Sequence, residues 1–225
     1  MAEAPFIAVE GPIGIGKTSL AAKLSAYLNV HLLKEIVDEN PFLGKFYDNI
    51  EEWSFQTEMF FLCNRYKQLE DTERYYLKQN QGVIADYHIF KNMIFARRTL
   101  PSDKFTKYEQ IYGILTEDMP LPNIVIYLHA SLDTILKRIR LRGRVIEQNI
   151  ETSYLAQIAQ DYEFYMDEFE KRHPDIPIIR INGDDMDFIS YQQDLEAIIN
   201  RVTKQLTDFQ ANPHIKGAHN HEFTR

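Results

Sequence analysis

The sequence predicts an α/β fold of three layers, in which helices flank both faces of a parallel, five-stranded sheet. Short apolar segments alternate with segments of helical periodicity along the chain of 225 residues. This alternation is typical of βα units, whose strands run parallel. A glycine-rich loop joins the first apolar segment to the first helical one, which is a common start for a fold of this class.

Each expected strand is a short apolar run bounded by turn residues or polar residues. The five runs cover residues 5–10, 31–37, 82–86, 124–128 and 176–181. Helical periodicity fills the intervals and is clearest over residues 16–28, 51–77, 132–141, 154–170 and 195–206. No linker or repeat interrupts residues 1–208, so we expect one domain there and a polar tail over residues 209–225.

Charge and cysteine content argue against several classes of protein. The formal net charge is −8 and the basic residues are spread along the chain, so a nucleic-acid polymer is not expected as a partner. Cys63 is the only cysteine, which excludes an internal disulfide and favours a reducing compartment. No apolar run is long enough to span a membrane, and we therefore expect a cytoplasmic protein. The histidines of the tail are interpreted as part of a polar terminus and not as a metal site.

The strongest motif lies between the first strand and the first helix, where residues 11–18 match the pattern G-x-x-x-x-G-K-[ST] in full. Its members are Gly11, Pro12, Ile13, Gly14, Ile15, Gly16, Lys17 and Thr18. Glycines let successive backbone N–H groups face one anion, and the following helix presents its positive end to phosphate. We expect Lys17 to reach the β- and γ-phosphate oxygens of ATP and the Thr18 hydroxyl to coordinate Mg²⁺.

A second ligand for Mg²⁺ is expected at Asp86, which closes the third apolar run. Sites with this phosphate loop hold the metal ion with an acid on a neighbouring strand, directly or through water. The alternative is that Asp86 caps the helix that follows.

Three arginines lie near the end of the helix expected over residues 132–141. Arg138 and Arg142 share a helix face at a spacing of four residues, and Gly143 ends the helix before Arg144. Because like charges repel, we expect an anion between them, and arginines neutralise the charge of a phosphoryl group in transfer. The alternative is a solvated helix end, where arginine also suits the helix dipole.

Together these motifs resemble the deoxynucleoside kinases, and within them the bacterial branch of deoxyguanosine and deoxyadenosine kinases. The resemblance spans residues 5–208 and is most specific in EIVDENPF (35–42), KFY (45–47), WSF (53–55) and RGR (142–144) followed by Glu147. It implies a P-loop kinase fold with an Arg-rich lid, and a homodimer. It also implies that ATP and Mg²⁺ serve to phosphorylate the 5′-hydroxyl of a purine deoxynucleoside in nucleotide salvage.

The resemblance also implies roles for single residues. Glu35, at the end of the second strand, is the general base that takes the proton of the 5′-hydroxyl, and Lys17 and Arg138 join it in catalysis. Tyr47 and Glu147 bind the sugar 3′-hydroxyl, while Arg142 and Arg144 bind the triphosphate. The apolar positions around the nucleoside are Val37, Leu43 and Phe95, with Phe95 a candidate to stack on the base.

Two positions depart from the family pattern. The family usually has Asp/Glu-Arg-Ser/Thr after the third strand, but this chain has Asp86-Tyr87-His88. An arginine near the transferred phosphate is therefore absent from that position, and Tyr87 receives no role.

The second departure concerns the base, because the usual glutamine is Glu58 here. An ionised carboxylate only accepts hydrogen bonds, and guanine offers two adjacent donors that it can bridge, whereas adenine offers no such pair. Arg65 lies two helical turns further on the same face, where it could orient Glu58 and donate to the guanine O6/N7 edge. The pattern favours deoxyguanosine over deoxyadenosine. A plain salt bridge between Glu58 and Arg65 is the rival interpretation.

Three alternative functions are weighed against this one. A deoxyadenosine kinase would share every motif named above, and only the guanine preference expected of Glu58 argues against it. A nucleoside monophosphate kinase of the thymidylate type needs further cations for its acceptor phosphate, and the missing arginine after Asp86 argues against it. A nucleotide-binding switch protein that reads guanine normally carries Asn-Lys-x-Asp, which the chain lacks.

Overall fold

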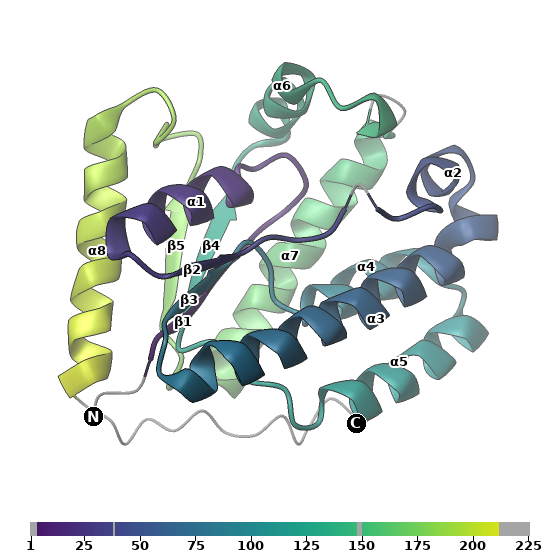
Figure 1. Ribbon diagram of the computed structural model, residues 1–225. Helices are drawn as coiled ribbons and strands as arrows, with labels where there is room; N and C mark the ends of the chain where they lie inside the picture. The colour runs from purple at the N-terminus through teal and green to yellow at the C-terminus, as the bar shows by residue number, and fades with distance from the viewer. Residues whose placement is uncertain (1–3, 38, 148–149, 212–225) are drawn as a thin grey trace.

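The computed structural model describes residues 4–37, 39–147 and 150–211, apart from the side chain of Ile146. Its five strands run parallel in the order β2-β3-β1-β4-β5 (Figure 1). They are β1 (Phe6–Glu10), β2 (His31–Leu33), β3 (Val83–Ala85), β4 (Ile124–His129) and β5 (Ile178–Asn182). The predicted α/β fold with a parallel sheet of five strands is confirmed.

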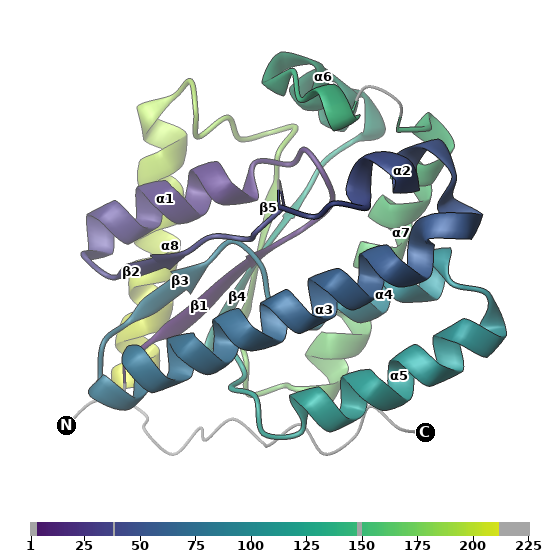
Figure 2. The same cartoon turned by 45° about the vertical axis from the view of Figure 1, so that its right-hand side comes forward.

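Helices cover both faces of this sheet, as Figures 1 and 2 show. α1 (Lys17–Leu28) and α8 (Gln192–Ala211) lie on one face. The other face carries α3 (Ile50–Tyr75), α4 (Lys91–Thr99), α5 (Ser102–Thr116) and α7 (Thr152–Arg172). The remaining elements are the helices α2 (Leu43–Asp48) and α6 (Leu132–Arg142) and the short 3₁₀ turns η1 (Leu77–Gln79) and η2 (Val145–Glu147).

Alternation along the strands explains the two covered faces. In β4, Ile124, Ile126 and Leu128 pack with α1 and α8, whereas Val125 and Tyr127 pack with α7 on the opposite face. Successive side chains of a strand point to opposite faces, so a strand that is apolar throughout has to be buried on both. None of the helices in the described ranges is both long enough and apolar enough to cross a membrane.

Strand β2 is shorter than the run from which it was predicted, which extends to residue 37. Its last ladder bond runs from the Asp86 N–H to the Leu33 carbonyl at 3.0 Å. Beyond this point the Glu35 N–H donates to the Asp86 carboxylate at 2.7 Å and not to a neighbouring strand. The chain therefore leaves the sheet at Leu33 and carries Glu35 to the edge where the strands end.

Helices α4 and α5 were not placed individually from the sequence. Every residue from 87 to 94 is buried, including the first residues of α4, so this segment has no polar face that would mark its period. Its burial brings two polar side chains, Lys91 and Asn92, into the interior at the carboxyl edge of the sheet.

Candidate active site

The loop of residues 11–18 joins β1 to α1 in a conformation that requires glycine. Gly11, Gly14 and Gly16 have φ angles of 144°, 81° and 108°. A Cβ atom on Gly11 would stand 2.2 Å from the Leu128 carbonyl oxygen. One on Gly14 would stand 2.4 Å from the Cγ1 of Ile139 in α6. The loop is thus held between the sheet and α6, with the start of α1 behind it, as a phosphate site needs.

Lys17 lies along this loop. Its Nζ donates to the carbonyl oxygens of Gly11 at 2.7 Å and Pro12 at 2.9 Å. Burial, with the positive charge of Lys91, lowers the pKa of Lys17 to about 8. A cation that is held by two carbonyl oxygens and disfavoured by its surroundings would gain from an anionic ligand.

Thr18 and Asp86 meet at the carboxyl edge of the sheet. The Thr18 hydroxyl donates to Oδ2 of Asp86 at 2.5 Å, and Oδ1 of Asp86 accepts the Glu35 N–H. A hydroxyl and a carboxylate are hard oxygen donors that suit Mg²⁺. The described residues contain no group of three or more His, Cys, Asp or Glu side chains able to hold a metal ion. Mg²⁺ at this place would take its other ligands from water and phosphate, as it usually does.

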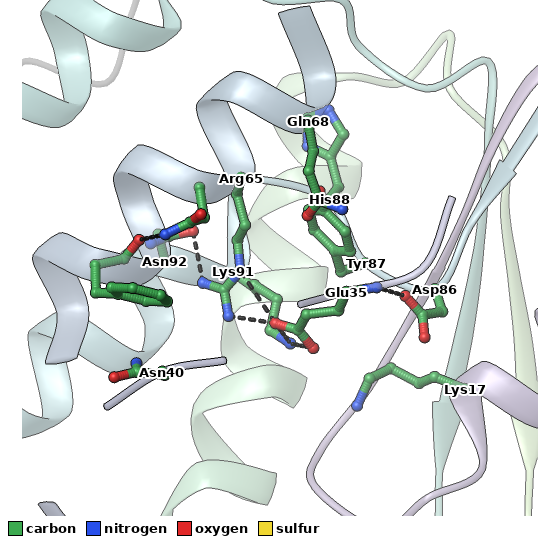
Figure 3. A network of polar contacts seen from close by, with 12 residues as sticks. Lys17, Glu35, Asn40, Arg65, Gln68, Asp86, Tyr87, His88, Lys91 and Asn92 are labelled. Atoms are coloured by element: carbon green, nitrogen blue, oxygen red, sulfur yellow. Dashed lines mark hydrogen bonds and ion pairs between the residues drawn. The ribbon is translucent and has the colours of Figure 1, made fainter. Parts of the chain in front are cut away.

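Glu35 lies at the centre of a buried network of charges (Figure 3). Lys91 Nζ donates to both carboxylate oxygens at 2.9 Å. Arg65 donates to Oε1 through Nε at 3.0 Å and also through Nη2, while its Nη1 donates to Asn92 Oδ1 at 2.7 Å. Burial alone would raise the pKa of Glu35, but Lys91 and Arg65 outweigh it and hold the pKa well below its usual range. In the free protein Glu35 is therefore an ionised carboxylate.

The expected contact between Arg65 and Glu58 is absent from the described residues, because Arg65 is engaged with Glu35. Glu58 is 2% exposed, and its Oε1 accepts a long hydrogen bond of 3.5 Å from the Thr99 hydroxyl. Its Oε2 has no hydrogen-bond partner in the described part of the chain. Burial raises the pKa of Glu58 to about 7, against the opposing charges of Arg65 and Lys91. A buried acceptor without a donor is a place where a ligand with donors would bind.

The residues expected at the sugar lie on two elements that pack together, Tyr47 on α2 and Glu147 in η2. Glu147 is buried and accepts from Arg142 through Nε at 3.0 Å and through Nη2, and Arg144 Nη1 lies 3.6 Å from its Oε1. Burial and the charge of Glu147 raise the pKa of Tyr47. In this state both arginines are paired with Glu147.

Arg138 occupies a different place from the other two arginines. Its Nη1 donates to the Ile15 carbonyl at 2.7 Å, and its Nη2 donates to the Gly183 carbonyl at 2.9 Å. Arg138 thus connects α6 to the phosphate loop and to the turn after β5.

The three predicted apolar residues fall into one cluster. Leu43 is buried, and Val37 and Phe95 are partly buried against the same core. The Phe95 ring meets the Tyr162 ring edge-on, with 6.1 Å between centroids, and its centroid lies 5.6 Å from Lys91 Nζ. Phe95 therefore stands between the charged network and the apolar cluster.

Two residues at the centre of the site were missed from the sequence, Lys91 and Glu10. Glu10 ends β1 and accepts from the His88 N–H at 2.5 Å, the Tyr162 hydroxyl at 3.1 Å and the Gly11 N–H at 3.4 Å. Burial raises its pKa. In the sequence, Lys91 and Glu10 each stand as a single charged residue inside or beside an apolar run. This isolated charge was the signal that could have marked them as site residues. Tyr87 donates its hydroxyl to Gln68 at 2.8 Å.

Comparisons with known proteins identify the family of this chain and agree with its fold. A family model described as deoxynucleoside kinase matches residues 7–207. The chain is 54% identical to a deoxyguanosine kinase of Bacillus subtilis, over 90% of this chain and 98% of that one. It is 29% identical to a deoxyadenosine/deoxycytidine kinase of the same organism, over 91% and 94% of the two chains. The structure of deoxyadenosine kinase from M. mycoides with bound dATP superimposes with a TM-score of 0.75 at 25% identity, covering 88% of this chain and 99% of that chain.

Proposed function

This chain belongs to the deoxynucleoside kinase family, and from that premise we propose that it transfers the γ-phosphoryl group of Mg-ATP to the 5′-hydroxyl of a purine deoxynucleoside, with deoxyguanosine preferred. One observation carries the proposed chemistry. The backbone of Glu35 is joined through Asp86 to Thr18 of the phosphate loop. A carboxylate, which is the base that the proposed transfer needs, thus lies beside the place where a triphosphate would bind.

The phosphate loop and Lys17 would bind the triphosphate. Backbone N–H groups of the loop and the start of α1 favour anions, and the Lys17 ammonium would exchange its two carbonyl partners for phosphate oxygens. Thr18 and Asp86 would hold Mg²⁺, which when bound neutralises charge on the phosphate oxygens. Arg138 keeps the loop in place through the Ile15 carbonyl.

Glu35 would act as the general base. The O5′–H bond breaks and its proton passes to a carboxylate oxygen of Glu35, while O5′ forms a bond to the γ-phosphorus. The bond from that phosphorus to the bridging oxygen breaks, and its electron pair leaves with ADP. Most of the rate gain in such a reaction comes from positioning and charge stabilisation.

Glu58 would read the base. As a carboxylate it would accept hydrogen bonds from the ring N–H and the amine of guanine. These would give Oε2 the donor that it lacks among the described residues and would add to the long bond that Oε1 accepts from Thr99. Leaving such an acceptor buried without a donor costs about 1–3 kcal/mol. The name of the 54% identical relative, a deoxyguanosine kinase, supports the same preference.

Tyr47 and Glu147 would bind the sugar 3′-hydroxyl as donor and acceptor. Arg142 and Arg144 pair with Glu147 in the free protein. Their proposed contact with the triphosphate therefore requires this group of residues to rearrange when substrates bind. We also expect a homodimer, which the resemblance to the family implies.

A panel of acceptors tests the function directly. The protein is incubated with Mg-ATP and each deoxynucleoside or its monophosphate, and ADP formation is followed. We expect turnover with deoxyguanosine first, deoxyadenosine next and no turnover with monophosphates. Turnover of monophosphates alone would contradict the proposed function and indicate a nucleoside monophosphate kinase. Tight nucleotide binding without turnover would indicate a nucleotide-binding switch protein.

A further inference from the structure

Lys91 is the first residue of α4, and its ammonium group lies inside the protein. The residue is 4% exposed, and Nζ lies 2.9 Å from each carboxylate oxygen of Glu35. Arg65 reaches the same carboxylate, as Figure 3 shows. One negative charge thus has two buried cations as direct partners.

Neutralising Glu35 does not require both cations. Arg65 donates to Glu35 twice and is fixed on its far side by Asn92, so it already supplies a full positive charge in a defined geometry. Net stability is a weak reason for a second buried cation, because the cost of removing a charge from water offsets most of its attraction. Lys91 and Lys17 also lie around the same buried site, as Figure 3 shows, and like charges repel.

Other charges around Lys91 only partly balance it. The buried carboxylate of Glu10 feels its field, which opposes the effect of burial on the pKa of Glu10. No hydrogen bond or ion pair joins Glu10 to Lys91 among the described residues, where Glu10 binds His88, Tyr162 and Gly11. Tyr87, just after β3, carries no charge and donates to Gln68. Among the described residues Glu35 is therefore the one ion-pair partner of Lys91, and neutralising Glu35 would leave the ammonium without a direct counter-charge.

We propose that Lys91 is a catalytic residue whose ammonium passes from Glu35 to the phosphoryl group in transfer, which rests on the proposed role of Glu35 as the base. When Glu35 takes the proton of the 5′-hydroxyl, its carboxylate becomes neutral and Lys91 loses its counter-charge. At the same moment negative charge is carried on the oxygens of the transferring group. An ammonium group directed at those oxygens stabilises this state and not the ground state, as a catalytic group must.

The two cations divide the task according to their chemistry. Arg65 is held by Asn92 as well as Glu35, so its planar guanidinium stays in place. The Lys91 side chain is a flexible stem with a compact charge, which can turn from one oxygen partner to another. Arg65 keeps Glu35 oriented throughout, and Lys91 moves.

Substitution of Lys91 tests this role. Lys91→Met should lower kcat about 100- to 1,000-fold, as expected for loss of one group that stabilises transition-state charge. The KM values for ATP and the nucleoside should stay within about threefold, because little ground-state binding is removed. Lys91→Arg should recover part of kcat. Lys67→Met, which changes an exposed lysine of α3, is the matched control and should behave as wild type. A normal kcat for Lys91→Met, or a loss confined to KM, overturns the proposal.

A double variant separates direct action from support of Glu35. If Lys91 acts on the phosphoryl group, Glu35→Gln/Lys91→Met is at least about tenfold slower than Glu35→Gln in radiolabel transfer. If Lys91 only orients Glu35, the two rates are equal and the proposal fails. The double variant removes both members of the buried pair, so it also replaces Lys91→Met should that protein not fold.

The wild-type protein distinguishes failure of this proposal from failure of the proposed function. Inactivity of the wild type with every deoxynucleoside would refute the function. Activity that is undiminished in Lys91→Met and in the double variant relative to Glu35→Gln would refute only the role of Lys91. The assay uses whichever deoxynucleoside the wild type phosphorylates fastest, so the outcome does not depend on the base preference.

Discussion

The Thr18 hydroxyl and the Asp86 carboxylate, 68 residues apart in the chain, form a hydrogen bond of 2.5 Å. Parallel strands end at one edge of the sheet, so the residues that follow β1 and β3 come together there. The fold itself thus brings together the two oxygen donors proposed for Mg²⁺.

Asp86→Asn should therefore raise the Mg²⁺ concentration needed for half-maximal rate and lower kcat by about 10- to 100-fold. Asparagine keeps an oxygen that can accept the Glu35 N–H, so the fold should persist. The measurements are the rate against Mg²⁺ concentration and the melting temperature without the ion. Asp71→Asn, on the surface of α3, is the control. An unchanged Mg²⁺ dependence would argue against Asp86 as a ligand.

Glu58→Gln should reverse the preference between the purines. The glutamine amide would present a donor to a guanine donor, so kcat/KM for deoxyguanosine should fall about 100-fold or more, while deoxyadenosine turnover should be kept or improved. The ratio of the two kcat/KM values is the measurement. Glu73→Gln, a partly exposed residue of the same helix, serves as control. Equal losses for both substrates would contradict a carboxylate that reads the base.

The carboxyl group of Glu58 should also make the preference for deoxyguanosine over deoxyadenosine depend on pH. Burial raises the pKa of Glu58 to about 7, although Arg65 and Lys91 oppose this and Glu35 adds to it. Below this pKa the group is a neutral acid with one donor, and above it an acceptor that suits guanine. The ratio of kcat/KM for deoxyguanosine over deoxyadenosine should therefore rise with pH between about 6 and 8. Because both substrates meet the same other groups, the ratio isolates Glu58, and Glu58→Gln should abolish the change.

Gly11→Ala should destabilise the protein by more than about 2 kcal/mol. The new Cβ would stand 2.2 Å from the Leu128 carbonyl oxygen, and the φ angle of 144° is unfavourable for alanine. Gly113→Ala is the matched control, because Gly113 lies within α5 and a Cβ there meets nothing within 4 Å. This second change should stabilise by about 0.5–1 kcal/mol. Urea unfolding of both variants measures the two effects.

Much of the fold was predictable because its signals are local. Five apolar runs specified the strands, and the pattern at residues 11–18 specified the phosphate loop. Glu35 was placed at the strand edge, but its strand ends at Leu33 because a side chain, Asp86, takes the next backbone donor. That exchange depends on a residue 51 positions away, which no local pattern reports.

The ion pair of Arg65 shows why the contacts within the site were harder to predict from the sequence than the fold. Helical spacing places Arg65 and Glu58 on one face of α3, and that geometry favoured a contact between them. Tertiary packing brings a second carboxylate, Glu35, to Arg65, and Lys91 joins it from α4. Which acid an arginine binds is decided by the competition among all charges in the interior, and the sequence does not show which of them meet.

If Arg142 and Arg144 bind the triphosphate and Glu147 binds the sugar, as proposed above, their pairing with one another links the binding of the two substrates. A triphosphate that drew the arginines away would leave Glu147 able to accept the sugar hydroxyl, and a nucleoside that engaged Glu147 would release the arginines. Whichever substrate binds first spends free energy on opening this contact, and the second binds without that cost. By linkage each should tighten the other by the same factor. On this proposal the Arg-rich lid would favour joint binding of the phosphate donor and the acceptor.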